Sequence, residues 1–181
     1  MDLAGEHALD IAAGRLRQSF RGQAARLLVV ADLHGDGLPA SVQLSAKVLT
    51  ITTGSGANFA SVAGAEIFAE RLFPSEVTPK TPSFDLDFRL RGLQLPAGLG
   101  LPLGGDVRIL NFQAKVLGGL EFPATVDALG HWRDGGGIVE VERLETQYGP
   151  LYVRANGTLA LDQAMQPMGA MTAKVRGFFQ T

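Results

Sequence analysis

The segment VVADLHGDG, from Val29 to Gly37, holds the residues of this sequence that are best suited to catalysis. Asp32 and His34 follow an apolar run, and at the end of a strand such residues could hold a metal pair that activates water for hydrolysis. A site of this kind needs further ligands from later loops, but the sequence has only three histidines, His7, His34 and His131. We therefore expect a strand that ends here in a polar, glycine-rich turn without a metal, and metal-dependent hydrolysis at Asp32 and His34 is the alternative.

The other candidate catalytic groups are also explained by structure. The carboxylate pairs Asp85/Asp87 and Glu140/Glu142 stand two residues apart, a spacing that places each pair on one solvated strand face. No Gly-x-Ser-x-Gly segment occurs, and the absence of cysteine excludes thiolate catalysis and cysteine-bound zinc. We expect no catalytic residue, no cofactor and no metal, so the sequence does not predict an enzyme.

Charge and hydropathy narrow the classes of partner. The formal net charge of the 181 residues is −2, and the 16 basic residues form no block that could neutralise a row of phosphates. Binding of nucleic acid is therefore not expected. No run approaches the roughly 18 apolar residues of a transmembrane segment, and the opening MDLAGEHALD lacks the apolar region of a signal peptide.

Alternation of apolar and polar residues dominates the chain. It is clearest at Ser41–Val48, Ser83–Arg91, Leu110–Val116, Leu151–Leu161 and Met171–Val175. Such segments have one buried and one solvated face, as in antiparallel sheets, and short turns rich in Gly, Pro and Asp separate them. The sequence predicts a single, mainly β domain over residues 1–181, a curved antiparallel meander sheet with one short helix.

Three segments are interpreted individually. The alanine-rich stretch 57–73, which Pro74 follows, predicts the helix. The basic stretch 14–22 is interpreted as a turn that links two strands. Trp132, the only tryptophan, precedes a glycine-rich turn and is expected to anchor the adjacent core, because its ring favours burial and its N–H needs an acceptor.

The C-terminal stretch from Trp132 to Phe178 carries a recognisable set of motifs. These are Trp-x-x-Gly-Gly, an aromatic residue with Gly-Pro-Leu, Gly-Thr-Leu-x-Leu-Asp and Gln-Pro-x-Gly. They occupy Trp132, Gly135, Gly136, Gly149, Pro150, Leu151, Gly157, Thr158, Leu159, Leu161, Asp162, Gln166, Pro167 and Gly169. The stretch resembles the bacterial envelope family of domain of unknown function 2125. Tyr148 stands where that pattern usually has tryptophan.

The resemblance implies a Gram-negative protein that faces the periplasm. Members of the family are longer at both ends, so we expect this chain to be a portion of a protein anchored to the inner membrane through a segment that this chain lacks. The family's layout is similar to that of envelope proteins of the AsmA type, which are associated with lipid passage between membranes. That second likeness is one of fold, and function does not follow from fold alone.

Two functions remain open at this point. The first is a non-enzymatic envelope domain that binds or shields lipid acyl chains on the apolar face of its sheet. The residues expected on that face are Phe84, Leu86, Phe88, Leu90, Leu110 and Phe112; for each of them an ordinary closed core is the alternative. The second is a scaffold that contacts envelope proteins through strand edges or through polar faces around Arg89, Arg91 and Arg154.

Overall fold

The computed structural model describes residues 5–13, 16–53, 56–121 and 124–177 of the chain. Within these ranges, strands dominate and helices are short. The elements in chain order are β1 (Gly5–Ala13), β2 (Leu16–Leu33), β3 (Pro39–Thr53), β4 (Asn58–Arg71), β5 (Pro82–Gln94), the 3-10 turn η1 (Ala97–Leu99), β6 (Asp106–Leu117), α1 (Val126–Asp134), β7 (Ile138–Tyr148), β8 (Leu151–Leu161) and β9 (Pro167–Arg176).

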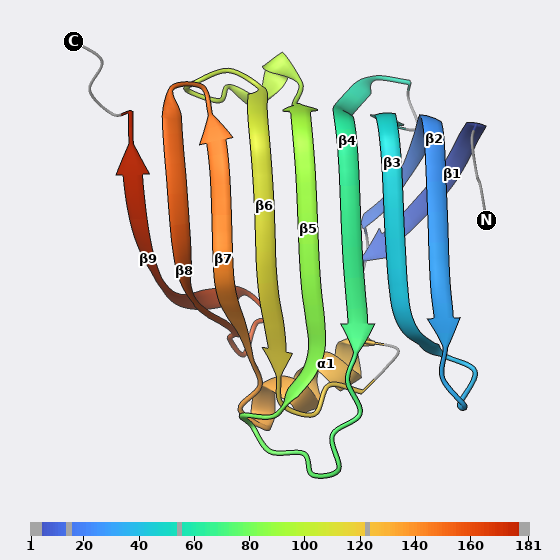
Figure 1. Cartoon of the computed structure of the whole chain (residues 1–181), viewed down its shortest axis with the longest axis vertical. Coiled ribbons are helices and arrows are strands. Elements are labelled where there is room, and N and C mark those ends of the chain that lie inside the picture. The colour runs from blue at the N-terminus through green and yellow to red at the C-terminus, as the bar shows by residue number, and fades with distance from the viewer. Residues whose placement is uncertain (1–4, 14–15, 54–55, 122–123, 178–181) are drawn as a thin grey trace.

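All described strands belong to one sheet, in which each strand pairs antiparallel with the next strand in the chain. The spatial order is therefore the chain order, from β1 at one edge to β9 at the other (Figure 1). This confirms the predicted antiparallel meander with one short helix. The five alternating segments singled out in the sequence lie within β3, β5, β6, β8 and β9.

The two faces of the sheet differ in chemistry because the register places like residues opposite each other. Phe88 lies opposite both Ile67 and Phe112. The face that they share, called here the inner face, also carries Leu27, Leu44, Ala46, Ala65, Leu86, Leu90, Leu110, Ala114, Val116, Val139, Val141, Leu144, Ala155 and Leu159. The other face, called the outer face, carries polar and charged residues such as Lys47, Glu66, Asp87, Arg89, Gln113 and Glu145.

A row of irregular positions crosses five strands near one end of the sheet. The row consists of one residue on each of five neighbouring strands, and regular pairing is interrupted at each of them. They are Ala25, Val48, Ala63, Gly92 and Arg108. Val48 and Gly92 have positive φ angles of 50° and 60°, a conformation that costs energy for valine. The alternation of side chains shifts by one residue at such a position, as in a β-bulge, and the strands bend.

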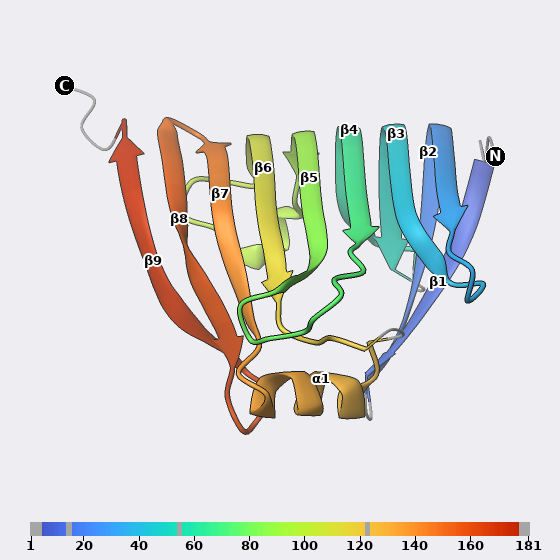
Figure 2. The same ribbon diagram turned by 60° about the horizontal axis from the view of Figure 1, so that its bottom comes forward.

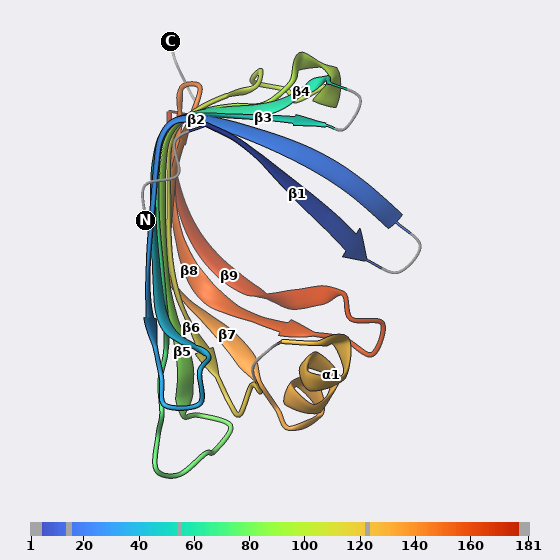
Figure 3. The same ribbon diagram turned by 90° about the vertical axis from the view of Figure 1, so that its right-hand side faces the viewer.

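The shift keeps apolar side chains on the inner face beyond the row. Leu49, Val62 and Leu93 lie past the bend and still pack in one cluster with Ala46, Ala65 and Leu90. Figure 3 shows the consequence, because the sheet curls over at this end and gives the molecule a concave and a convex side.

Helix α1 lies on the concave side, at the end where β6 stops and β7 begins (Figures 2 and 3). Near it, the inner-face residues Val116 and Val141 are buried, with exposures of 7% and 1%, whereas Glu140 and Thr158 of the outer face are exposed. The helix therefore covers the inner face, and we conclude that the apolar face is the concave one.

Trp132 fixes α1 to the sheet. Its side chain is 4% exposed and its Nε1 donates to the backbone oxygen of Leu117 at 2.7 Å, so the predicted burial and hydrogen bond are observed. Thr125 caps the helix, accepting a bond from the Ala128 backbone N–H at 3.2 Å. The helix itself was not predicted, although Thr125 and the acidic Asp127 in the first turn are the usual signals of a helix start.

Two sequence-based predictions are wrong. The stretch predicted as a helix, 57–73, contains β4, which runs from Asn58 to Arg71 between β3 and β5. Its alanines do favour a helix, but hydrogen bonding to two neighbouring strands and burial of Ala65 outweigh that local preference. The stretch 14–22 was interpreted as a turn, yet Leu16–Gly22 belongs to β2; residues 14 and 15 lie outside the described residues.

Candidate functional site

The centre of the inner face is formed by β5 and β6, which carry all six residues predicted for an apolar surface. Phe88 and Phe112 are directly opposed, with ring centroids 5.9 Å apart and planes tilted by 53°. Leu90 faces Leu110, and Leu86 and Phe84 continue the same row on β5 beside Ala114 and Val116. The structure thus brings Phe84, Leu86, Phe88, Leu90, Leu110 and Phe112 together as one continuous apolar strip.

The strip is only half-buried, because the second layer of the fold is a single short helix at one end. None of the six side chains belongs to the buried core. The buried apolar residues are mainly small: Ala24, Ala46, Ala60, Val62, Ala65, Ala114, Val116, Leu117, Ala128, Trp132, Val141 and Ala155. A closed domain buries its large apolar side chains first. An apolar strip that is only partly buried on a concave face has the shape and chemistry to receive another apolar surface.

The outer face is polar in its described part, and at its centre several charged side chains pair with one another. Asp87 accepts bonds from Arg89 (Nε to Oδ1, 3.0 Å; Nη2 to Oδ2, 2.7 Å) and from Gln113 Nε2 at 2.9 Å. Glu145 accepts bonds from Tyr152 and Arg143. The pairs predicted to form a solvated face, Asp85/Asp87 and Glu140/Glu142, both lie on this side.

These contacts shift the pKa values of three side chains in directions that follow from the geometry. Partial burial by itself would raise the pKa of Asp87, but the bonds from Arg89 and Gln113 outweigh it, so the pKa lies below its ordinary value. The hydrogen bond from Tyr152 is the largest influence that lowers the pKa of Glu145, and the same bond raises the pKa of Tyr152.

A pH-dependent contribution of Asp87 to stability follows. A carboxylate with a lowered folded-state pKa stabilises the protein above its unfolded pKa, and that contribution is lost as pH falls through the folded value. We expect Asp87→Asn to be less stable than the parent at pH 7 and close to it near pH 3, as measured by urea unfolding at both values. Asp106→Asn, at an exposed position at the start of β6, serves as the control. Its difference in unfolding free energy from the parent should be the same at both pH values. A constant difference for Asp87→Asn at both pH values would contradict the assignment.

The predicted turn residues Asp32 and His34 are occupied by other contacts. Asp32 Oδ2 accepts a bond from Ser41 Oγ at 2.8 Å, and the His34 ring stacks on Phe73 at a centroid distance of 3.9 Å. Arg71 lies over the same Phe73 ring and pairs with Asp36. Within the described residues, no group of three or more His, Cys, Asp or Glu side chains is placed to hold a metal ion.

The comparisons with known proteins give one match. The family model described as "Uncharacterized protein conserved in bacteria (DUF2125)" matches residues 1–181. The chain belongs to this family. Curated proteins and solved structures yielded no match. No described helix has both the length and the apolar character that crossing a membrane requires.

The DUF2125 motif residues lie away from the apolar strip. The end of α1 contains Trp132 and is followed by Gly135 and Gly136. The turn between β7 and β8 is formed by Gly149 and Pro150. The β8–β9 hairpin contains Gly157, Leu159, Asp162, Pro167 and Gly169. In that hairpin Asp162 Oδ1 accepts the backbone N–H groups of Ala164 and Gln166, both at 2.8 Å, and so caps the turn before Pro167. We conclude that these residues build the end of the sheet and its helix, whereas the strip is marked only by its alternating pattern.

Proposed function

We propose that this domain binds or shields the acyl chains of lipids on its inner face and catalyses no reaction. The observation that carries the proposal is a strip of large apolar side chains on a concave sheet that are only partly buried. They are Phe84, Leu86, Phe88, Leu90, Leu110 and Phe112. Covering apolar surface stabilises a complex by about 25 cal/mol per Å². An extended hydrocarbon chain has no polar groups to satisfy, and the strip offers none.

We propose further that the domain works at the bacterial cell envelope, in the periplasm, and is held at the inner membrane by a segment outside this chain. The resemblance of the Trp132–Phe178 motifs to an envelope family supports this placement. A curved sheet with one apolar face is also compatible with the weaker likeness to AsmA-type proteins. Fractionation of cells that carry the epitope-tagged full-length protein tests the placement: recovery with the cytosol would contradict it.

The lipid proposal is tested with a fluorescent polyene fatty acid and with phospholipids that co-purify from membranes. We expect the parent chain to bind the fatty acid and Phe88→Gln to bind it at least about tenfold more weakly, a difference of about 1.4 kcal/mol. Phe88 lies at the centre of the strip, between Ile67 and Phe112, so a polar side chain there interrupts its apolar surface.

Phe68→Gln is the matched control. Phe68 lies on the neighbouring strand β4 but on the outer face, opposite Asp87, and is 37% exposed. The same substitution is expected to leave fatty-acid binding unchanged there, with circular dichroism confirming that both variants fold. Absence of binding by the parent, or equal losses in both variants, would show that the inner face is not a lipid surface.

A further inference from the structure

Strand β9 forms an edge of the sheet that is open to a further strand. In the described part of the chain it pairs with β8 alone, through ten consecutive residue pairs from Tyr152↔Arg176 to Leu161↔Pro167 without a register shift. All ten of its residues are exposed. A long edge without a bulge presents a row of unpaired backbone donors and acceptors to any extended segment that approaches.

The outer face of this edge carries three cations, and Glu145, the acidic residue opposite Arg154 on β7, is already bound by Arg143 and Tyr152. Arg154 and Lys174 are directly opposite each other on β8 and β9, and Arg176 follows two residues later on the same face. Among the described residues, none of the three forms an ion pair or a side-chain hydrogen bond, whereas nearby Glu142 and Glu145 are bound by Lys115 and by Arg143 with Tyr152. Like charges directly opposite each other destabilise a sheet unless an anion lies between them.

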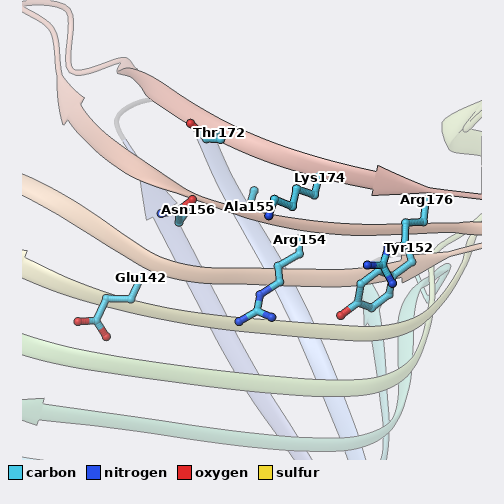
Figure 4. Close-up of a pocket in the computed structure, with 8 residues that line it drawn as sticks. All are labelled: Glu142, Tyr152, Arg154, Ala155, Asn156, Thr172, Lys174 and Arg176. Carbon is cyan, nitrogen blue, oxygen red and sulfur yellow. The ribbon is translucent and has the colours of Figure 1, made fainter.

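The three cations surround a depression of about 440 Å³ at this edge. Figure 4 shows Arg154, Lys174 and Arg176 gathered there with Tyr152, and Glu142 to one side. The inner face of the same strand is apolar: Met171 is 41% exposed and Val175 is 49% exposed. The edge thus combines free backbone groups, a basic outer row and an apolar inner row.

We propose that β9 binds an extended segment of a partner protein in which acidic and apolar residues alternate. Added as a tenth strand, such a segment places its carboxylates beside Arg154, Lys174 and Arg176 and its apolar side chains beside Met171 and Val175. Strand addition draws affinity from the backbone and specificity from the alternate side chains. The proposed site lies at the β9 edge and includes none of the six residues of the apolar strip on β5 and β6, so it can be tested separately from the lipid proposal.

Charge distinguishes this partner from a second copy of β9. The strand PMGAMTAKVR contains two basic residues and no acidic one. Pairing two β9 strands would bring the Lys174 and Arg176 side chains of both copies, and the adjacent Arg154 side chains, onto one face. The β9 strand of a second copy thus supplies no carboxylate for these cations, whereas an acidic partner does.

The test uses two capped nine-residue peptides, one alternating valine with glutamate and the other alternating valine with lysine. We expect the glutamate peptide to bind the 181-residue chain and to slow hydrogen–deuterium exchange of β9 amides, while the lysine peptide does neither. In the double variant Lys174→Glu/Arg176→Glu we expect at least tenfold weaker binding of the glutamate peptide and measurable binding of the lysine peptide.

The double variant Arg26→Glu/Lys47→Glu provides the matched control. Arg26 and Lys47 are also directly opposite cations, but they lie on the interior strands β2 and β3, so this variant should bind the glutamate peptide as the parent does. Failure of the glutamate peptide to bind, or equal binding of both peptides by the parent, would overturn the proposal. So would equal protection of β9 by inorganic phosphate, which would indicate a simple anion site, or dimerisation through β9 that excludes the peptide.

Discussion

Replacing Gly157 with valine is expected to destabilise the protein by more than about 3 kcal/mol. Gly157 lies in the middle of β8 between Val141 and Met171. A Cβ atom at this position would be 2.1 Å from the backbone oxygen of Ala170 and 2.8 Å from the Cα atom of Met171. Because these are backbone atoms, a rotamer change cannot relieve the overlap, and β9 must move away from β8. The melting temperature should fall by about 6 °C or more for a chain of this length.

Gly64→Val is the matched control for this prediction. Gly64 lies within β4, in ordinary extended backbone, and a Cβ atom there would meet no heavy atom within 4 Å. Valine favours strands, so we expect an unchanged or slightly higher melting temperature. Thermal unfolding followed by circular dichroism measures both variants. Equal melting temperatures for Gly157→Val and the parent would show that the tight approach of β8 and β9 does not exist in solution.

The faces of the sheet could be predicted from the sequence because each central strand alternates regularly. Ser83–Arg91 and Leu110–Val116 have one apolar and one polar set of residues, and the meander then pairs these strands in the register that matches the sets. For the same reason, the six residues of the strip could be named in advance. Their partial exposure could not, because it depends on the curvature of the whole sheet and on the single helix that covers it.

The errors arose where local preference and tertiary context disagree. The stretch FASVAGAEIFAER has the alanine content of a helix, and only its place between β3 and β5 makes it a strand. The bend across Val48, Ala63 and Gly92 involves positions on separate strands, so no single segment reveals it. Helix α1 is nine residues long with Gly130 inside it, which weakens its local signal. Tertiary contacts hold it: Ala128 and Trp132 are buried, and Arg133 donates to the backbone oxygens of the β8–β9 turn.

Truncating Trp132 to alanine is expected to have the largest effect of a single side chain, a loss of about 3–5 kcal/mol. The ring is 4% exposed and fills the space between α1 and the start of β7, where Gly137 lies against it. Its removal leaves a cavity and takes away the hydrogen bond to the Leu117 oxygen. Without this anchor we expect α1 to detach while the central strands keep their pairing, since within the described residues the helix makes no pairing of its own with the sheet.

Trp132→Phe separates the two contributions of the side chain. Phenylalanine retains most of the apolar volume but cannot donate to the Leu117 oxygen, so we expect an intermediate loss of about 1–3 kcal/mol. Urea unfolding of the parent and of both variants is followed by far-ultraviolet circular dichroism. Tryptophan fluorescence is not suitable, because the variants lack the only tryptophan of the sequence. Similar small losses in both variants would mean that neither the ring nor its N–H holds the helix, and that the contact between α1 and the inner face is not what closes this end of the sheet.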